Sequence, residues 1–569
     1  VRLVGSEMCI RDRAATSEVF GVEGTPVFDL TDADLVIDFG SELLDTGLSA
    51  TEHKRQLADA RDVEQHIDGG ARLVYVGSRL SLTASSSDEW LPAKPGSEGQ
   101  LALAIARVAI ESGNDQSLLN LVSGVSVSEA AQSSDIPAET IERLGRAVAR
   151  GKKVVALPPG PAVTSRRAVG ANAAVLVLNA VAGSIGNGVR ILPDQSESMK
   201  SSYKDALALI RQMNDGAVSV LFIHGSNPVF SMPEASGFAE ALTKVPVVVC
   251  TSSSPDETTA YASIILPDHS PLESWGDLLP RAGMRSLIQP SIQPLYDTRA
   301  LGDTVIGLGG ALGGTTADSM PEGDFRAALE RSWSDVDLRR AKAEGGVFEK
   351  LPAGEAPVVA SAIDAAVPML SGEGKYTLVA FPHSHFYDGR GAALPWLQEI
   401  PDPITIVGWQ CWDEISLKTA DDLGVEIGDV ISIETSAGSL EVSVYPRGGI
   451  RDDVVGVPIG QGHTEGHWAS KTCDGMPGQV RGVNVIDVLS PGVDEKGGRA
   501  WLTDHASLAA TGKTRRLPML QWSDNKRGRQ LGEVVSLAAL ASAAHGLSLI
   551  HISEPTRRTP ISYAVFCLK

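Results

Sequence analysis

Aromatic residues, cysteines and long hydrophobic runs are scarce in this sequence of 569 residues. The aromatic residues make up only 5% of the chain, and none of the five cysteines stands in a CxxC motif. An iron–sulfur or zinc framework therefore cannot be built from this chain alone. No run approaches the roughly 18 apolar residues of a membrane-spanning helix. Basic side chains number 49 against 70 acidic ones, and the net charge of −21 argues against a nucleic acid as the main partner.

The composition that remains is typical of a folded protein with large cores. Hydrophobic residues make up 43% of the chain and charged residues 21%, which excludes wholesale disorder. At roughly 100–200 residues per domain, the length predicts three or four domains.

The two ends differ from the rest of the chain. Residues 1–13 and 547–569 resemble translated sequencing-adapter sequence, and we leave both out of the fold prediction, with 536–546 as a linker before the second. Genuine terminal segments are the alternative interpretation. Without these ends, which carry +1 and +2, residues 14–546 carry −24, and Cys9 and Cys567 drop out. We then expect both natural termini, and any export signal, to lie outside this chain.

The first stretch, residues 14–192, alternates strand and helix patterns. Short apolar runs at 34–39, 71–76 and 153–157 predict strands, and the spacing at 99–111 and 137–150 predicts helices. Strands that alternate with helices indicate a parallel sheet with both faces covered.

The second stretch, residues 193–370, begins in the same way. Strands are predicted at 219–224, 245–251 and 264–267. The glycine-rich run at 308–316 is expected to be a loop, and residues 325–344 are expected to form one helix.

The third stretch, residues 371–535, changes character. Short strands are predicted at 376–381, 430–435, 439–444 and 453–458, and glycine-containing turns separate them. Short strands joined by regular turns indicate a β-barrel.

Small polar residues follow several predicted strands or precede a predicted helix. Ligands bind outside the carboxyl ends of parallel strands, where glycine lets backbone N–H groups approach a phosphate. Ordinary turns and a helix cap at Ser97 explain the same local pattern, so both interpretations stay open. The residues at these positions are Gly40, Ser78, Arg79, Gly96, Ser97, Gly225 and Asn227.

The histidines do not form a convincing metal motif. His463 and His467 are four residues apart, but their segment GQGHTEGHW is glycine-rich and lacks the HExxH order of zinc helices. No GxSxG motif is present, so an α/β-hydrolase lacks its central residue.

Four segments in order resemble the molybdopterin oxidoreductase family. They are LVYVGSRLSLTASSSDEWLPAKPGSEGQLALA at 73–104, LFIHGSNPVFSMP at 221–233, DETTAYASIILPDHSPLESWGD at 256–277, and the barrel-like segment at 419–463, which Gly482-Val483-Asn484 closes. The resemblance implies an α/β fold with two Rossmann-like domains that contain parallel sheets, followed by a C-terminal double-psi-type β-barrel. We expect these domains at 14–192, 193–370 and 371–535.

The resemblance also implies a cofactor, molybdopterin guanine dinucleotide. It gives no catalytic residue and no protein ligand to a metal in this chain. The positions that match the family's cofactor-binding segments are Gly40, Ser78, Arg79, Gly96, Ser97, Gly225, Asn227, Gln461, His463 and Asn484.

Three further segments are similar to the large molybdopterin-like subunit of alternative complex III. They are residues 388–405, 412–416 and 458–466. This similarity implies a bacterial membrane-bound respiratory complex that passes electrons from quinol toward cytochrome c or an oxidase. The subunit would lie peripherally on the periplasmic side, with other subunits as partners, no nucleic acid, and iron–sulfur clusters only in a segment outside this chain.

The chain departs from the family pattern at the first two turns. The first is Gly40-Ser41-Glu42 where the family has G-x-N-P, and the second, which ends at Arg79, lacks the family's Asp and Pro. A carboxylate at the first turn would repel a phosphate. These departures favour an electron-transfer subunit without its own molybdenum. The alternatives are a catalytic molybdenum enzyme for a sulfur, arsenic or nitrogen oxyanion, and a purely structural subunit.

Overall fold

The structure is a computed structural model. It describes residues 5–64, 69–113, 115–193, 201–352, 356–466, 472–473, 476–477 and 480–520. The predicted linker at 536–546 and the adapter-like segment at 547–569 lie outside the described residues.

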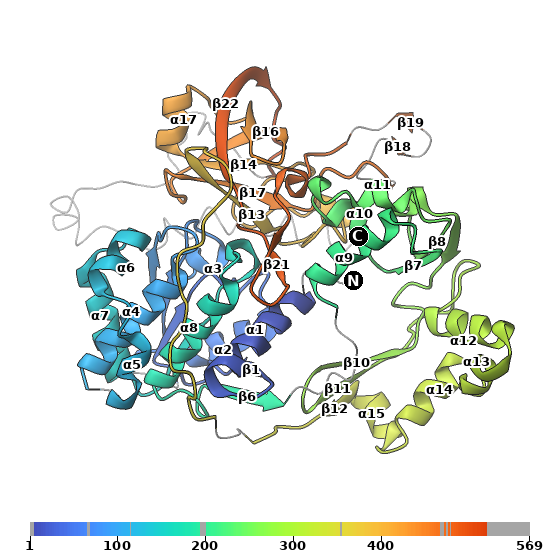
Figure 1. The fold of residues 1–569 in the computed structure, drawn as a ribbon, viewed down its shortest axis with the longest axis horizontal. Coiled ribbons are helices and arrows are strands. Elements are labelled where there is room, and N and C mark those ends of the chain that lie inside the picture. Colours follow the sequence, from blue (N-terminus) through green and yellow to red (C-terminus); the bar gives the residue numbers. More distant parts are fainter. Residues whose placement is uncertain are drawn as a thin grey trace, which may run out of the picture. The chain divides into compact units, whose positions relative to one another are not determined.

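A four-stranded parallel sheet lies in the first α/β region, coloured blue to cyan in Figure 1. Its strand order is β4 (Glu89–Leu91), β3 (Arg72–Val76), β2 (Leu35–Asp38) and β5 (Val154–Leu157). Every residue of β2 and β5 is buried, as expected for a parallel sheet covered on both faces. The predicted parallel sheet is confirmed.

Four helices build most of the core beside this sheet. Helix α4 (Glu98–Glu111) packs against α7 (Ala138–Arg150) and α8 (Ala168–Val181), and α8 also contacts β5 and α1 (Gly5–Phe20). Helix α1 runs through residue 13, where we expected a boundary. The region also contains α2 (Ala50–Ala60), α3 (Leu82–Ser85), α5 (Leu119–Val122), α6 (Val127–Ser134) and an antiparallel pair of β1 (Gly24–Phe28) with β6 (Val189–Pro193).

The second α/β region has a smaller parallel sheet. Strands β7 (Val220–His224), β8 (Val247–Ser252) and β9 (Ile264–Pro267) pair in that order. One face packs on helices α9 (Tyr203–Asn214) and α11 (Phe238–Leu242), with which it shares a hydrophobic core. The short helix α10 (Pro228–Ser231) follows β7.

The part that follows β9 differs from prediction. Strands β10 (Gly276–Arg281), β11 (Met284–Ile288) and β12 (Gly346–Phe348) form an antiparallel sheet. The loop predicted at 308–316 is wrong, because α12 (Leu301–Leu312) and α13 (Gly314–Ser319) cover most of it.

Close packing explains why glycine is compatible with helix α12. A Cβ at Gly302 would lie 2.1 Å from the ring of Phe325, and one at Gly309 would lie 2.3 Å from the sulfur of Met320. The break between α12 and α13 is at Gly313, whose φ is +70°. The single helix predicted at 325–344 is two helices, α14 (Phe325–Ser332) and α15 (Leu338–Glu344).

A segment of the predicted second domain packs against the first. Ala365 belongs to the hydrophobic core of the first sheet, and Val358 and Ile363 pack against the same core. The backbone N–H of Val359 donates to the carbonyl of Val19. The predicted boundary at residue 370 therefore does not follow the packing of residues 356–365.

A closed barrel of six strands follows, coloured orange to red in Figure 1. Strands β13 and β17 pair in parallel, as do β14 and β16, and the other neighbours are antiparallel. Apolar side chains fill the interior, and the β-barrel predicted from short strands and regular turns is confirmed. In barrel order the strands are β13 (Tyr376–Pro382), β17 (Val454–Ile459), β14 (Asp413–Ser416), β16 (Ser439–Arg447), β15 (Asp429–Glu434) and β22 (His505–Thr514).

Short elements complete the described barrel region. They are helices α16 (Pro395–Glu399) and α17 (Leu417–Leu423), the pair β18 (Thr472–Cys473) and β19 (Met476–Pro477), and the pair β20 (Gly492–Val493) and β21 (Arg499–Ala500). In the part of the chain that the structure describes, no helix is both long and apolar enough to cross a bilayer.

Candidate functional site

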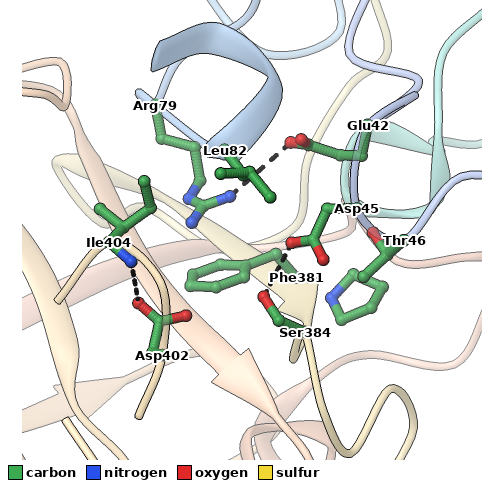
Figure 2. A pocket seen from close by; sticks show the side chains of 10 residues that line it. Glu42, Asp45, Thr46, Arg79, Leu82, Phe381, Ser384, Asp402 and Ile404 are labelled. Carbon is green, nitrogen blue, oxygen red and sulfur yellow. Dashed lines mark hydrogen bonds and ion pairs between the residues drawn. The ribbon is translucent and has the colours of Figure 1, made fainter. Parts of the chain in front are cut away.

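Arg79 lies where the first α/β region meets the barrel. Its guanidinium is 3.3 Å from a carboxylate oxygen of Glu414 and 3.7 Å from one of Glu42. The guanidinium carbon also lies 3.6 Å from the ring centre of Phe381. Figure 2 shows the Arg79 side chain above this ring and directed toward Glu42. Two carboxylates and an aromatic face therefore already occupy the contacts that Arg79 could offer a phosphate or a base.

Glu414 is the buried centre of this cluster. It lies on β14 with no exposed surface, and Arg447 lies 3.1 Å from the same carboxylate oxygen that faces Arg79. The indole N–H of Trp412 donates to its other oxygen over 3.3 Å. Burial raises the pKa of Glu414, but the charges of Arg79 and Arg447 outweigh this effect, so the pKa lies below its ordinary value.

Glu42 contacts the cluster from the turn after β2. The hydroxyl of Tyr75 donates to its carboxylate over 2.8 Å. Burial raises the pKa of Glu42, and the positive charge of Arg79 opposes that shift. The backbone φ of Glu42 is +57°, a strained value for a residue with a side chain.

The cavity beside Arg79 is very small. Its volume is about 10 Å³, which is room for about one water molecule, whereas ligand pockets measure roughly 300–1,000 Å³. Three acidic residues and one basic residue line it, and the hydroxyl of Ser384 donates to Asp45 over 2.8 Å. The residues that line it are Glu42, Asp45, Thr46, Arg79, Leu82, Phe381, Pro382, Ser384, Asp402 and Ile404 (Figure 2).

A second cluster surrounds Glu257, in the loop after β8. Its carboxylate accepts hydrogen bonds from the Asn227 amide (2.6 Å) and from Nδ1 of His463 (3.1 Å). It also accepts from the backbone N–H groups of Thr464 and Glu465. Burial opposes ionisation of Glu257, but these hydrogen bonds and the His463 charge outweigh it and lower its pKa to about 2.

Phe230 joins three of the predicted residues. The imidazole of His463 stacks on the Phe230 ring with centroids 3.8 Å apart, and the Asn484 amide donates to the Phe230 carbonyl over 2.9 Å. Asn227 begins the helical turn that contains Phe230. The structure therefore brings Asn227, His463 and Asn484 into one cluster. Gln461 lies outside it and exchanges side-chain hydrogen bonds with Gln398.

The predicted residues at the ends of the strands mostly bond to nearby backbone. The Gly40 carbonyl accepts from the N–H of Gly160, the Ser78 carbonyl accepts from the N–H of Arg451, and the N–H of Gly225 donates to the Thr251 carbonyl. Each of these glycine or serine positions thus stabilises the contact between neighbouring loops.

Gly96 and Ser97 also have contacts inside the protein. A Cβ at Gly96, whose φ is +87°, would lie 2.7 Å from Pro368. Ser97 is the residue before α4, but its hydroxyl donates to the Lys94 carbonyl and does not cap the helix. Ser97 therefore holds the expected N-cap position of α4, but its side chain makes no capping bond because the hydroxyl faces the preceding turn.

The charged partners of these residues escaped prediction. Glu414 lies in β14 and Arg447 at the end of β16, both outside the strands predicted at 376–381, 430–435, 439–444 and 453–458. Glu257 lies in the DETTA segment. The sequence signal for Glu414 is the acidic pair in WDEIS, since two adjacent carboxylates in a buried strand require partners. No local pattern identifies Arg79 as that partner, because the two residues are 335 positions apart.

The described residues contain no group of three His, Cys, Asp or Glu side chains placed to hold a metal ion. His467 lies outside the described residues, so its predicted lack of a zinc role with His463 stays a prediction. His383 and His385 follow β13, and their rings lie 5.4 Å apart. Burial lowers the pKa of His383 to about 3, which keeps its ring neutral.

Two known proteins are similar in sequence to this chain. The menaquinone reductase molybdopterin-binding-like subunit of Nitratidesulfovibrio vulgaris is 26% identical over 524 residues, which cover 85% of this chain and 71% of that protein. The molybdopterin-containing subunit ArrA of arsenate respiratory reductase from Shewanella sp. is 22% identical over 355 residues. These residues cover 48% of this chain and 41% of that protein.

A solved structure shares the fold. Acetylene hydratase from Pelobacter acetylenicus superimposes with a TM-score of 0.67 at 16% identity, over 89% of this chain and 82% of the hydratase. The mixed α/β architecture with parallel sheets is therefore that of a molybdopterin enzyme. The model of the family described as molybdopterin oxidoreductase matches residues 8–303, more than half of the sequence. The chain belongs to the molybdopterin oxidoreductase family.

Proposed function

We propose that this chain is the molybdopterin-like subunit of a membrane-associated respiratory complex that exchanges electrons with a quinone, and that it binds no molybdenum dinucleotide of its own. Its similarity to a menaquinone reductase subunit over 85% of the chain supports the first part. The contacts of Arg79 support the second part.

The residues present do not fit a molybdopterin guanine dinucleotide. A pyrophosphate needs unpaired donors and room, but Arg79 is paired with Glu42 and Glu414 and covered by Phe381. The adjoining cavity has a volume of only about 10 Å³. Two carboxylates beside that position would also repel a phosphate. The second cluster is occupied in the same way, since Asn227 and His463 both bond to Glu257.

In this proposal the complex transfers the electrons, and this chain is a structural scaffold within it. Electrons would pass through iron–sulfur clusters in segments outside this chain. This chain would hold those clusters near its partner subunits on the periplasmic side of the membrane. Quinol and cytochrome c would interact with the complex rather than with the residues described.

Metal and pterin analysis of the native complex tests this proposal. The complex is purified from membranes through a tag on this chain, and molybdenum, iron and oxidised pterin are measured per chain together with quinol oxidation. We expect iron, quinone-linked activity and no stoichiometric molybdenum or pterin.

Other results would assign a different function. Stoichiometric molybdenum with pterin would overturn the proposal in favour of a catalytic oxidoreductase for an oxyanion, as the name of the arsenate reductase relative suggests. A tagged chain that purifies without partner subunits, iron or quinone-linked activity would also overturn it.

A further inference from the structure

Two arginines from distant parts of the chain face one buried carboxylate oxygen. Arg79 follows β3, Arg447 ends β16, and both lie within 3.3 Å of the same oxygen of Glu414. The arginine side chains are about nine-tenths buried, and Glu414 has no exposed surface. Two guanidinium groups that converge on one point out of water form a binding site for an oxyanion.

The cluster also joins two parts of the fold. The Arg447 guanidinium donates to the carbonyl of Leu80 over 2.7 Å, and the N–H of Leu80 donates to the carbonyl of Gly449. Arg79 pairs with Ile450 as an isolated antiparallel bridge. The segment after β3 is therefore attached to the barrel directly around Glu414.

Charge balance shows why this site takes no external anion. The positive charges of Arg79 and Arg447 face the negative charges of Glu414 and Glu42, so the cluster is close to neutral. Removal of Glu414 alone would leave two buried guanidinium groups with one carboxylate, at 3.7 Å from Arg79. Unpaired buried charges are strongly destabilising, so the site would then favour any small oxyanion that fits.

We propose that Arg79 and Arg447 form an oxyanion-binding site that the chain fills with the carboxylate of Glu414, and that this internal ligand fastens the segment after β3 to the barrel. In the native chain the ligand is the Glu414 carboxylate, and without it the site is expected to take a small carboxylate of similar size. The inference rests on one part of the proposed function, namely that no dinucleotide binds at Arg79.

Chemical rescue of a Glu414→Ala variant tests this inference. The substitution removes a group the size of acetate, so acetate and formate are the matching probes, with inorganic phosphate as a larger one and chloride at equal ionic strength as the reference. Thermal unfolding of the full chain is measured in each salt. We expect Glu414→Ala to lower Tm by several degrees and acetate or formate to restore a large part of that loss in a saturable way.

Three controls make the result specific. Wild-type protein is expected to show no difference between acetate and chloride, because its site is filled. Glu441→Ala removes a half-exposed carboxylate of β16 that pairs with Lys513 and is expected to change Tm little in any salt. Glu414→Gln keeps the shape of the side chain but removes its charge, so we expect a lower Tm than wild type. We expect no recovery of Tm in acetate or formate, because the glutamine amide still fills the space between the two guanidinium groups.

Each outcome decides the inference. If Glu414→Ala does not fold in chloride, the yield of soluble protein after refolding in acetate against chloride replaces Tm, with the same expectation. Equal Tm or equal yield in acetate and chloride would overturn the inference, as would a wild-type Tm near that of Glu414→Ala. Molybdenum in the native complex would overturn the proposed function, whereas this rescue is measured on the chain alone.

Discussion

The carboxylate of Glu257 accepts a hydrogen bond from Nδ1 of His463 over 3.1 Å, and both side chains are more than nine-tenths buried. The pair joins the loop after β8 to the loop after β17. The stacking of His463 on Phe230 fixes the plane of the imidazole. Two segments 206 residues apart in the chain are thus joined by an ionisable pair, and the backbone N–H groups of Thr464 and Glu465 donate to the same carboxylate.

Glu257→Gln is expected to destabilise the protein in a pH-dependent way. The folded state lowers the pKa of Glu257 from 4.5 to about 2, so the carboxylate contributes its full stability above pH 4.5 and loses it as the pH falls toward 2. This shift corresponds to about 3 kcal/mol. Thermal unfolding should show a lower Tm for the variant at pH 7 and a gap to wild type that narrows below pH 4.5.

Glu240→Gln is the matched control, because Glu240 is an exposed residue of helix α11 in the same region. It should change Tm little at either pH. A gap between Glu257→Gln and wild type that stays constant from pH 7 to pH 3 would contradict the expected role of the Glu257 carboxylate.

Glu98→Gln is expected to stabilise the protein at alkaline pH. Burial raises the pKa of Glu98 from 4.5 to about 8, so the folded state keeps a proton that the unfolded chain has lost. Stability therefore falls as the pH rises from 4.5 toward 8. The neutral amide removes this dependence, and the variant should gain about 2–4 kcal/mol over wild type at pH 8 and little at pH 4.5.

Urea unfolding at the two pH values measures this difference. Glu139→Gln serves as the control, since Glu139 is an exposed residue in the first turn of α7. If Glu98→Gln and wild type kept the same difference at both pH values, the buried carboxyl would not carry the extra proton.

Gly302→Ala and Gly310→Ala should act in opposite directions, although both residues lie in helix α12. A Cβ at Gly302 would lie 2.1 Å from the ring of Phe325, whereas one at Gly310 meets no atom within 4 Å. The first substitution should cost about 1–3 kcal/mol through overpacking. The second should stabilise the helix by roughly 0.5–1 kcal/mol, because alanine has the higher helix propensity.

Circular dichroism during thermal unfolding compares these two variants with wild type. An unchanged Tm for Gly302→Ala would mean that Phe325 does not pack on α12 as described. A destabilising Gly310→Ala would mean that this part of the chain is the loop predicted from its glycine content.

The sequence by itself determined the local elements and the family. Strands β2, β3 and β13 follow from apolar runs that end in glycine or polar residues, because burial in a sheet depends on side chains only a few residues apart. The order of four motifs was enough to identify the molybdopterin oxidoreductase family, and the model of that family matches residues 8–303.

Only the tertiary structure decided what the candidate residues contact. Arg79 was predicted to line a cofactor, but its partner Glu414 is 335 positions away, and no periodicity relates residues at that separation. The glycines of α12 were assigned to a loop for the same reason, since the Phe325 ring that packs on Gly302 lies outside any helical repeat. The pairing of buried charges and close side-chain packing depend on which distant segments the fold brings into contact. The local sequence around each residue does not encode those long-range contacts.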